Sequence, residues 1–392
     1  MLSRISLRRF SVLGAAKAAQ KAEVDWIASK NQWSYFNDES YVKRSESLKL
    51  NKPEIRESLL SNSSESGPAS IENYSQRLAY HSPVAIDETF KMAYEMLETD
   101  AGLIYKNIDR FRAKLKTATD EKEIEFLKKT IDKLLVSAEI SNPEVLYNAT
   151  FNPASTLDMS QPVYRQLAKE KWESYDLMIT MQRLEQLHVI PDTLPTLEPK
   201  VDVKVKFPHN LEEEFSSWVT PGEILPAYAV AQPPTIQIQE FDTVESKQLY
   251  SVLIVNPDTP DLATNSFSTT LQYGLANVPL DNVDNVIDTK KLLENGDKFT
   301  FKDYVPLVPE KNAQNQRACL WVFKQNGELS IGDVARENFD IRAFVETHGL
   351  NAVGAHVWRQ HFDRSVETVR EQYGLGKGRV FRRVRGTKPI IE

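Results

Sequence analysis

The stretch Leu253-Ile254-Val255-Asn256-Pro257-Asp258-Thr259-Pro260 decides the fold of the C-terminal half of this chain. Its first residues continue an apolar run from Tyr250 that is rich in β-branched side chains and apolar enough for a buried strand. Pro257 and Pro260 have no backbone N–H to donate, so we expect them to end the ladder. The sequence therefore predicts a buried strand that presents Asp258 in a rigid turn at the mouth of a sheet.

The surrounding sequence predicts more strands of the same sheet region. Residues 201–207 alternate valine and phenylalanine with charged side chains, which is typical of a half-buried strand. Further strands are predicted at 235–238, 250–255, 271–278, 299–305 and 318–323, and helices at 340–347 and 361–373. Short strands between Pro, Gly and Asn turns indicate a β-sandwich or barrel. We place this β domain at residues 196–375 of an α+β protein.

Helical patterns dominate residues 86–195, which we interpret as a helical extension. A first helix is predicted to begin at Asp87 or Thr89, since either side chain suits an N-cap. A second helix has an apolar stripe opposite a charged face, which is most simply a solvated face. A third is predicted from Pro162 to His188.

The first 22 residues are basic, amphipathic and free of acidic side chains. An Arg-rich and Ser-rich segment of this kind is typical of a mitochondrial transit peptide, although a basic disordered tail is the alternative. Residues 23–85 carry aromatic side chains among polar ones with no sustained period. We expect an extended, weakly structured segment there, either anchored on another surface or disordered.

Composition excludes several classes of protein. The chain has 392 residues and a formal net charge of −7, which argues against a simple basic nucleic-acid-binding protein. Its single cysteine, Cys319, rules out an internal disulfide and a cysteine-based zinc site. No apolar run approaches the roughly 20 residues that a membrane-spanning helix needs.

The C-terminal tail, residues 376–392, is basic although the chain as a whole is net acidic. Six basic side chains stand there against one acidic side chain, Glu392, and Gly374, Gly376 and Gly378 are predicted to keep the tail flexible. Such a tail suits a nucleic-acid phosphate backbone, although a solvated tail is the alternative. The candidate RNA-binding residues are Lys377, Arg379, Arg382, Arg383, Arg385 and Lys388.

Motifs for metal binding and catalysis are weak in this sequence. His356 and His361 are five residues apart, which is not the i, i+4 spacing that places two ligands on one helix face. The glycines near residue 376 are not followed by the Lys-Ser/Thr of a phosphate loop, and there is no nucleophile-elbow motif. We predict no metal, no cofactor and no catalytic residue.

Four sequence boxes of the β region resemble the phosphatidylethanolamine-binding protein (PEBP) family in their order. The boxes are Asn256–Pro260, Tyr273–Asn277, Tyr304–Pro309 and Gln316–Leu320. The resemblance implies an anion pocket made by two carboxylates of the first box and two histidines. In this chain Asn256 stands at the first carboxylate, and Gln316 stands at the last histidine.

The remaining histidine position of the family reads Leu271 or Gln272 in this chain. Loss of both imidazoles removes the donors that a phosphate pocket needs at neutral pH. We expect a retained scaffold in which Asp258 and Arg317 pair with each other and have a structural role. The degenerate ligand pocket is predicted to consist of Asn256, Asp258, Gln272, Gln316 and Arg317.

A degenerate PEBP domain between a transit peptide, a helical extension and a basic tail resembles the PEBP-like family of the mitochondrial large ribosomal subunit. The resemblance implies a structural, non-enzymatic constituent of that subunit at its central protuberance, in the mitochondrial matrix. Its implied partners are mitochondrial ribosomal RNA and neighbouring large-subunit proteins, with no small-molecule substrate. The alternatives are a mitochondrial phospholipid- or phosphoester-binding regulator of the PEBP family and a mitochondrial hydrolase.

Overall fold

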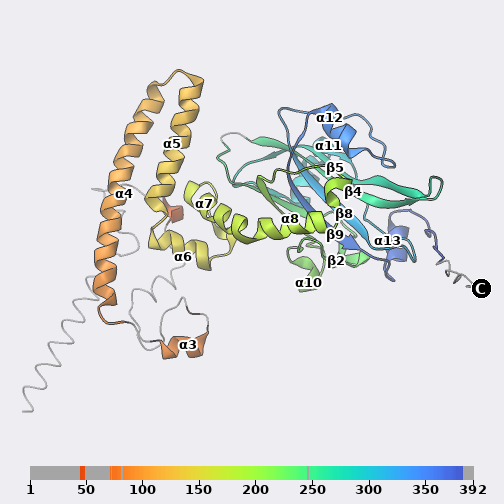
Figure 1. Cartoon of the computed structure of the whole chain (residues 1–392), viewed down its shortest axis with the longest axis horizontal. Helices are drawn as coiled ribbons and strands as arrows, with labels where there is room; N and C mark the ends of the chain where they lie inside the picture. Colours follow the sequence, from red (N-terminus) through yellow and green to blue (C-terminus); the bar gives the residue numbers. More distant parts are fainter. Residues whose placement is uncertain (1–44, 49–70, 72, 81–82, 245–246, 383–392) are drawn as a thin grey trace, which may run out of the picture. The chain divides into compact units, whose positions relative to one another are not determined.

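The computed structural model describes residues 45–48, 71, 73–80, 83–244 and 247–382 (Figure 1). The predicted transit peptide and most of the predicted extended segment lie outside these residues. The chain divides into two compact units, Met1–Ala168 and Lys169–Glu392. In the part of the chain that is described, no helix combines the length and apolarity needed to cross a membrane.

A helical hairpin is the main element of the first unit. α4 (Ile86–Thr117) and α5 (Glu121–Glu139) lie side by side, and their contact buries Tyr105, Ile108 and Ile131 (Figure 1). This confirms the apolar stripe predicted for the second helix. The predicted N-cap of α4 is wrong. The helix begins after Ala85, whose backbone is left-handed, and the hydroxyl of Thr89 donates back to the carbonyl oxygen of Ala85.

Shorter helices complete the described part of the first unit. They are η2 (Glu46–Leu48), α3 (Tyr74–Ala79), α6 (Pro143–Phe151), η3 (Ala154–Thr156) and α7 (Pro162–Lys171), whose last three residues belong to the second unit. α6 begins with the predicted turn signal, because the Asn142 side chain accepts a hydrogen bond from the N–H of Glu144 and Pro143 occupies the first turn. Val145 and Tyr164 pack with Leu48 in a small separate core.

The second unit contains two sheets. Their strands are β1 (Val201–Lys206), β2 (Ile224–Leu225), β3 (Thr235–Glu240), β4 (Gln248–Asp261), β5 (Ser266–Leu280), β6 (Val286–Ile287), β7 (Thr300–Lys302), β8 (Gln316–Lys324) and β9 (Asn351–Gln360). One sheet has the order β1-β3-β6 and the other has the order β2-β9-β8-β4-β5-β7. The β2–β9 pair is parallel and the other pairs are antiparallel.

Helices and short turns link and flank the sheets. These elements are η4 (Trp172–Asp176, a π-helical turn), α8 (Leu177–Gln186), α9 (Val189–Asp192), α10 (Glu213–Ser216), η5 (Ala227–Val230), α11 (Thr289–Phe299), α12 (Ile341–His348) and α13 (Val366–Gln372). The helix predicted to end at His188 therefore has a π-helical turn inside it and ends at Gln186.

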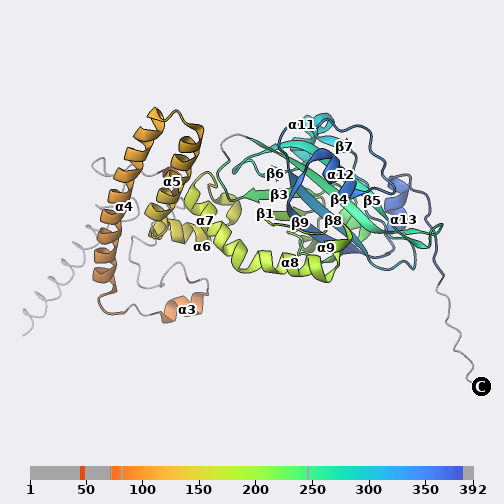
Figure 2. The same cartoon turned by 45° about the horizontal axis from the view of Figure 1, so that its top comes forward.

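Both faces of the larger sheet are covered, which explains the unbroken apolar run at residues 252–255. Val252 and Ile254 face the smaller sheet and form the sandwich core with Val203 and Ile236. Their neighbours on β4 face the other way, into a second core that includes residues of α8 and α12 (Figure 2). Cys319 lies in this second core and is fully buried. A strand buried on both faces needs no polar alternation.

Some predicted elements differ from those observed. β9 was not predicted, although it is an interior strand of the six-stranded sheet, between β2 and β8. Its sequence includes Gly354, His356 and Gln360, which lower strand propensity. Gly354 is required there because a Cβ atom would lie 2.6 Å from Cγ2 of Val203 on the facing sheet. α11 was not predicted, and α13 is shorter than the helix predicted at residues 361–373.

Candidate functional site

The two prolines of the opening stretch do not end β4, contrary to the prediction. β4 pairs with β8 only as far as Val255, opposite Cys319. It then continues with β5 alone, through Pro260 opposite Phe267, to Asp261. Pro257 lies in a register shift between Asn256 and Thr259, where the regular pairing with β5 is interrupted. Beyond Val255, β4 pairs with β5 and no longer with β8. A missing N–H is tolerated at a bulge or on a free edge, so the prolines end pairing on one side only.

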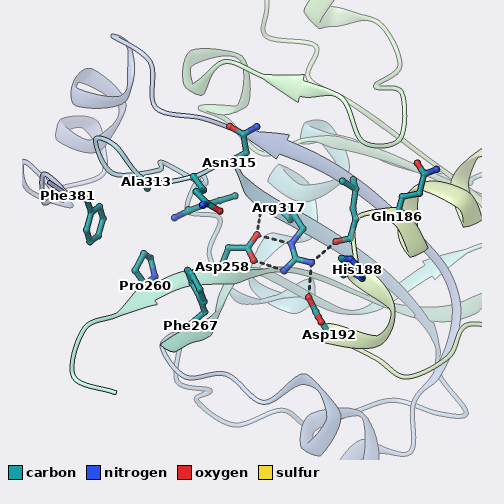
Figure 3. Close-up of a pocket in the computed structure, with 13 residues that line it drawn as sticks. Gln186, His188, Asp192, Asp258, Pro260, Phe267, Ala313, Asn315, Arg317 and Phe381 are labelled. Carbon is teal, nitrogen blue, oxygen red and sulfur yellow. Dashed lines mark hydrogen bonds and ion pairs between the residues drawn. The ribbon is translucent and has the colours of Figure 1, made fainter. Parts of the chain in front are cut away.

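Arg317 and Asp258 form the predicted ion pair at the point where β4 and β8 separate. Nη2 of Arg317 lies 2.5 Å from Oδ1 of Asp258, and Nε lies 2.8 Å from Oδ2 (Figure 3). The backbone N–H of Arg317 also donates to Oδ2, at 2.8 Å. The two side chains are only 16% and 19% exposed. This bidentate geometry fixes the guanidinium plane.

The segment after α8 supplies two further partners that the sequence did not reveal. Nη1 of Arg317 donates to the Leu187 carbonyl oxygen at 2.6 Å and to Oδ2 of Asp192 at 2.8 Å (Figure 3). Burial opposes the charge on Arg317, but the hydrogen bonds to Asp258 and Asp192 and the charge of Asp258 outweigh it and raise the pKa of Arg317. Four of the five side-chain N–H groups therefore already have protein acceptors.

Neutral amides occupy the other predicted pocket positions. Asn256 is 3% exposed, and its amide donates to Oε1 of Gln316 at 3.2 Å and to Oγ1 of Thr259 at 3.1 Å. Its own Oδ1 accepts from the N–H of Asp258 at 2.9 Å. Asn256 thus holds the turn closed through uncharged hydrogen bonds.

The third amide, Gln272, is not joined to this network by any hydrogen bond of the described residues. Its Oε1 is buried and has no hydrogen-bond partner within the described part of the chain. Its neighbour Leu271 is fully buried in the core between the sheet and the helices. Of the two residues that the sequence left open for the histidine position, Leu271 is part of the hydrophobic core and Gln272 carries the buried polar group.

A cavity of about 710 Å³ opens beside the ion pair. Its lining residues are Gln186, Leu187, His188, Asp192, Asp258, Pro260, Phe267, Ala313, Gln314, Asn315, Gln316, Arg317 and Phe381. Pro260, Phe267 and Phe381 gather at one end, and Asp192 and His188 lie at the other (Figure 3). Of the predicted pocket residues, Asp258, Gln316 and Arg317 line this cavity, whereas Asn256 and Gln272 do not.

The described part of the C-terminal tail has a defined conformation. Gly374, Gly376 and Gly378 have φ values of 65°, 66° and 72°, in the left-handed region that favours glycine. The Arg370 guanidinium donates to the carbonyl oxygen of Gly376 at 3.0 Å. The N–H of Phe381 donates to the carbonyl oxygen of Lys311 at 3.0 Å. The three glycines thus shape a turn in this part of the tail.

The candidate RNA-binding residues fall into two groups. Lys377, Arg379 and Arg382 are described, and all three are exposed. Arg383, Arg385 and Lys388 lie outside the described residues. Exposed Lys311 lies beside the tail, because its backbone pairs with that of Val380 in an isolated bridge.

The two histidines considered for a metal site have different surroundings. His356 is buried, and Nε2 lies 3.1 Å from the carbonyl oxygen of Val219, whereas His361 is exposed. Burial lowers the pKa of His356 to about 4. Among the described residues, no group of three or more His, Cys, Asp or Glu side chains is placed to hold a metal ion.

Comparisons with known proteins agree with this architecture. Residues 215–359 match the family model described as phosphatidylethanolamine-binding protein. The chain is 32% identical over 238 residues to large ribosomal subunit protein mL38 of Schizosaccharomyces pombe, which covers 59% of this chain and 72% of that protein.

Solved structures are also similar to part of this chain, at low identity. A phosphatidylethanolamine-binding protein from Plasmodium vivax is 16% identical, with a TM-score of 0.35, over 47% of this chain and 98% of that chain. Carboxypeptidase Y inhibitor, in complex with its cognate proteinase, is 11% identical, with a TM-score of 0.38, over 47% of this chain and 95% of that chain. On the strength of the sequence relationship and the family-model match, the chain belongs to the family of large ribosomal subunit protein mL38 and contains a phosphatidylethanolamine-binding-protein domain.

Proposed function

We propose that this chain is a structural constituent of the mitochondrial large ribosomal subunit and supports mitochondrial translation. The observation that carries the proposal is the 32% identity to mL38 over 72% of that protein's length. The basic N-terminal segment supports import into mitochondria, and with it a location in the matrix. Within the subunit, the position that we propose for the chain is the central protuberance.

The site geometry supports a non-enzymatic role. A phosphoester needs donors that are not already engaged and a local charge that tolerates an anion. Here Arg317 is engaged by Asp258, Asp192 and the Leu187 carbonyl group. The two carboxylates of Asp258 and Asp192 carry one more charge than the Arg317 guanidinium neutralises, so this cluster has a net negative charge. We therefore propose that the predicted pocket is degenerate and that Arg317 and Asp258 brace the end of the sheet.

Contacts with ribosomal RNA are assigned to the basic tail. Lys377, Arg379 and Arg382 are exposed, and the next basic residues follow directly in the sequence. The chain as a whole has a formal net charge of −7, so a local basic segment at the C-terminus concentrates electrostatic attraction for RNA there. Neighbouring large-subunit proteins are the other partners of the proposal.

Depletion and complementation test this function. Cells depleted of the chain should lose assembled mitochondrial large subunits and organellar protein synthesis, and the wild-type chain should restore both. An Asp258→Asn variant that keeps its fold should also restore both, because the proposal assigns no ligand or catalytic role to the site. Restoration by wild type but not by a stably folded Asp258→Asn chain would favour the phosphoester-binding alternative. Undiminished large subunits after full depletion would contradict the proposal.

A further inference from the structure

The cavity beside Arg317 is a groove between the end of the β4–β5 pair and the loop that precedes β8. β4 leaves β8 after Val255 and continues as a two-stranded arm with β5, whereas the chain before β8 turns away through residues 313–316. The groove lies between this arm and that loop, and its far wall is the segment after α8 (Figure 3). Its volume of about 710 Å³ is within the range of about 300–1,000 Å³ that is usual for binding sites.

One end of the groove is apolar and exposed. Phe267 on β5 is 70% exposed. Pro260 lies opposite it in the strand register, and Phe381 lies across from both (Figure 3). Phe381 is held in place through its backbone, because its N–H donates to Lys311 and its carbonyl oxygen accepts from the Asn312 side chain at 2.7 Å. An apolar side chain of a ligand would find a preformed surface here.

The other end of the groove carries an unused acceptor. Asp192 is 45% exposed, and only its Oδ2 accepts a hydrogen bond, from Arg317. Within the described residues its Oδ1 has no hydrogen-bond partner, whereas both oxygens of Asp258 are engaged by Arg317. The negative charge that Arg317 does not neutralise is therefore accessible at the partly exposed carboxylate of Asp192. A cation fits this end of the groove and an anion does not.

The backbone of the arm does not suit strand addition. The edge of β4 that borders the groove carries Pro257 and Pro260, and neither can donate a backbone hydrogen bond to an added strand. We therefore expect side chains to supply most of the recognition in this groove. A chain segment with one basic and one apolar side chain would satisfy both ends.

We propose that this groove binds an extended peptide segment of a neighbouring protein, with a Lys or Arg side chain on Asp192 and an apolar side chain against Phe267 and Phe381. The proposal rests on the proposed function in taking the partner to be another protein of the same assembly. It goes beyond that function by naming the site and the chemistry of the partner. It also reverses the charge of the ligand that the PEBP resemblance implied.

Peptide selection tests the groove directly. The full-length chain is panned against a phage library of random linear heptapeptides, and the enriched peptides are synthesised and titrated by fluorescence anisotropy. The enriched peptides should combine Lys or Arg with an aromatic or aliphatic residue. Asp192→Asn, which keeps an acceptor for Arg317, and Phe267→Ala should each weaken their binding at least tenfold.

Two matched variants control for general surface effects. Asp333→Asn removes a carboxylate that is 95% exposed, and Leu262→Ala removes an exposed side chain from the same arm; neither residue lines the groove. Both variants should bind the peptides as wild type does. All variants are first compared with wild type by thermal unfolding.

Several results would overturn the inference. They are a failure to enrich any peptide, enrichment of acidic peptides, equal binding by all four variants, and displacement of the peptide by a 12-residue polyuridylate. Panning uses the isolated chain, so its outcome is separate from association with ribosomes. A chain that binds these peptides but does not sediment with the large subunit would contradict the proposed function and leave the peptide groove supported.

Discussion

Replacing Asp258 by alanine removes the acceptor of three hydrogen bonds from Arg317. Breaking one partner of a buried ion pair costs about 3–5 kcal/mol. Two features reduce that figure here. The side chains keep 16% and 19% exposure, and Asp192 and the Leu187 carbonyl group remain on the guanidinium. We therefore expect Asp258→Ala to lower the free energy of unfolding by about 2–3 kcal/mol.

A double-mutant cycle isolates the pair from the loss of packing. Arg317→Ala should destabilise by a similar amount, because it leaves two carboxylates without their shared cation. The double variant should be less destabilised than the sum of the two single variants, with a coupling energy of about 1–2 kcal/mol. Urea unfolding of the full chain measures these values, with the fluorescence of the fully buried Trp321 and Trp358 as the signal.

The control for this cycle is Asp333→Ala. Asp333 pairs with Lys302 at 3.1 Å, but its side chain is 95% exposed, so its removal should change stability by less than about 0.5 kcal/mol. An Asp258→Ala chain as stable as Asp333→Ala would refute the bracing role of the pair. Additive single effects would refute the direct coupling between Asp258 and Arg317.

Three further predictions concern other parts of the chain. Burial lowers the pKa of His356 to about 4 from its usual 6.5, so the unfolded chain binds more protons between these values. Stability should therefore fall by about 1.4 kcal/mol for each pH unit between pH 6.5 and 4, and His356→Gln should flatten this slope while His361→Gln should not. Gly354→Ala should destabilise by about 1–3 kcal/mol in urea unfolding, because its Cβ would meet Val203 at 2.6 Å, and a neutral result would contradict this packing. Deletion of residues 377–388 should weaken association with ribosomal RNA and reduce its salt dependence by about 0.7–0.9 in log–log slope for each phosphate that the tail neutralises, and an unchanged slope would show that the tail binds no phosphate.

β1, β3, β4, β5, β7 and β8 could be predicted because each of them carries a local signal. The run at residues 252–255 is apolar on both faces, and residues 201–207 alternate. β9 gave no such signal, since Gly354 and His356 are explained only by their contacts with β1 and with Val219. These contacts join distant parts of the chain, so propensity and periodicity do not report them.

Only the part of the candidate site that lies within recognisable sequence boxes could be predicted. Asp258 and Arg317 were paired on the basis of their positions in two family-like boxes, and the structure confirms the pair. Asp192 was missed because it lies 125 residues away from Arg317, in a segment predicted to belong to the helical extension. The end of β4 was predicted wrongly because the sequence around Pro257 and Pro260 does not show which edge of the strand is free.

Sedimentation of mitochondrial extract at high and at low magnesium, followed by detection of this chain, decides whether it is a constituent of the large subunit. Such a constituent should co-sediment with that subunit at high magnesium, and should move with the subunit's other proteins when low magnesium separates the subunits. It should not be found with soluble matrix proteins in either condition. A chain that stays at the top of the gradient with soluble proteins, at both low and high salt, would contradict a structural role in the ribosome.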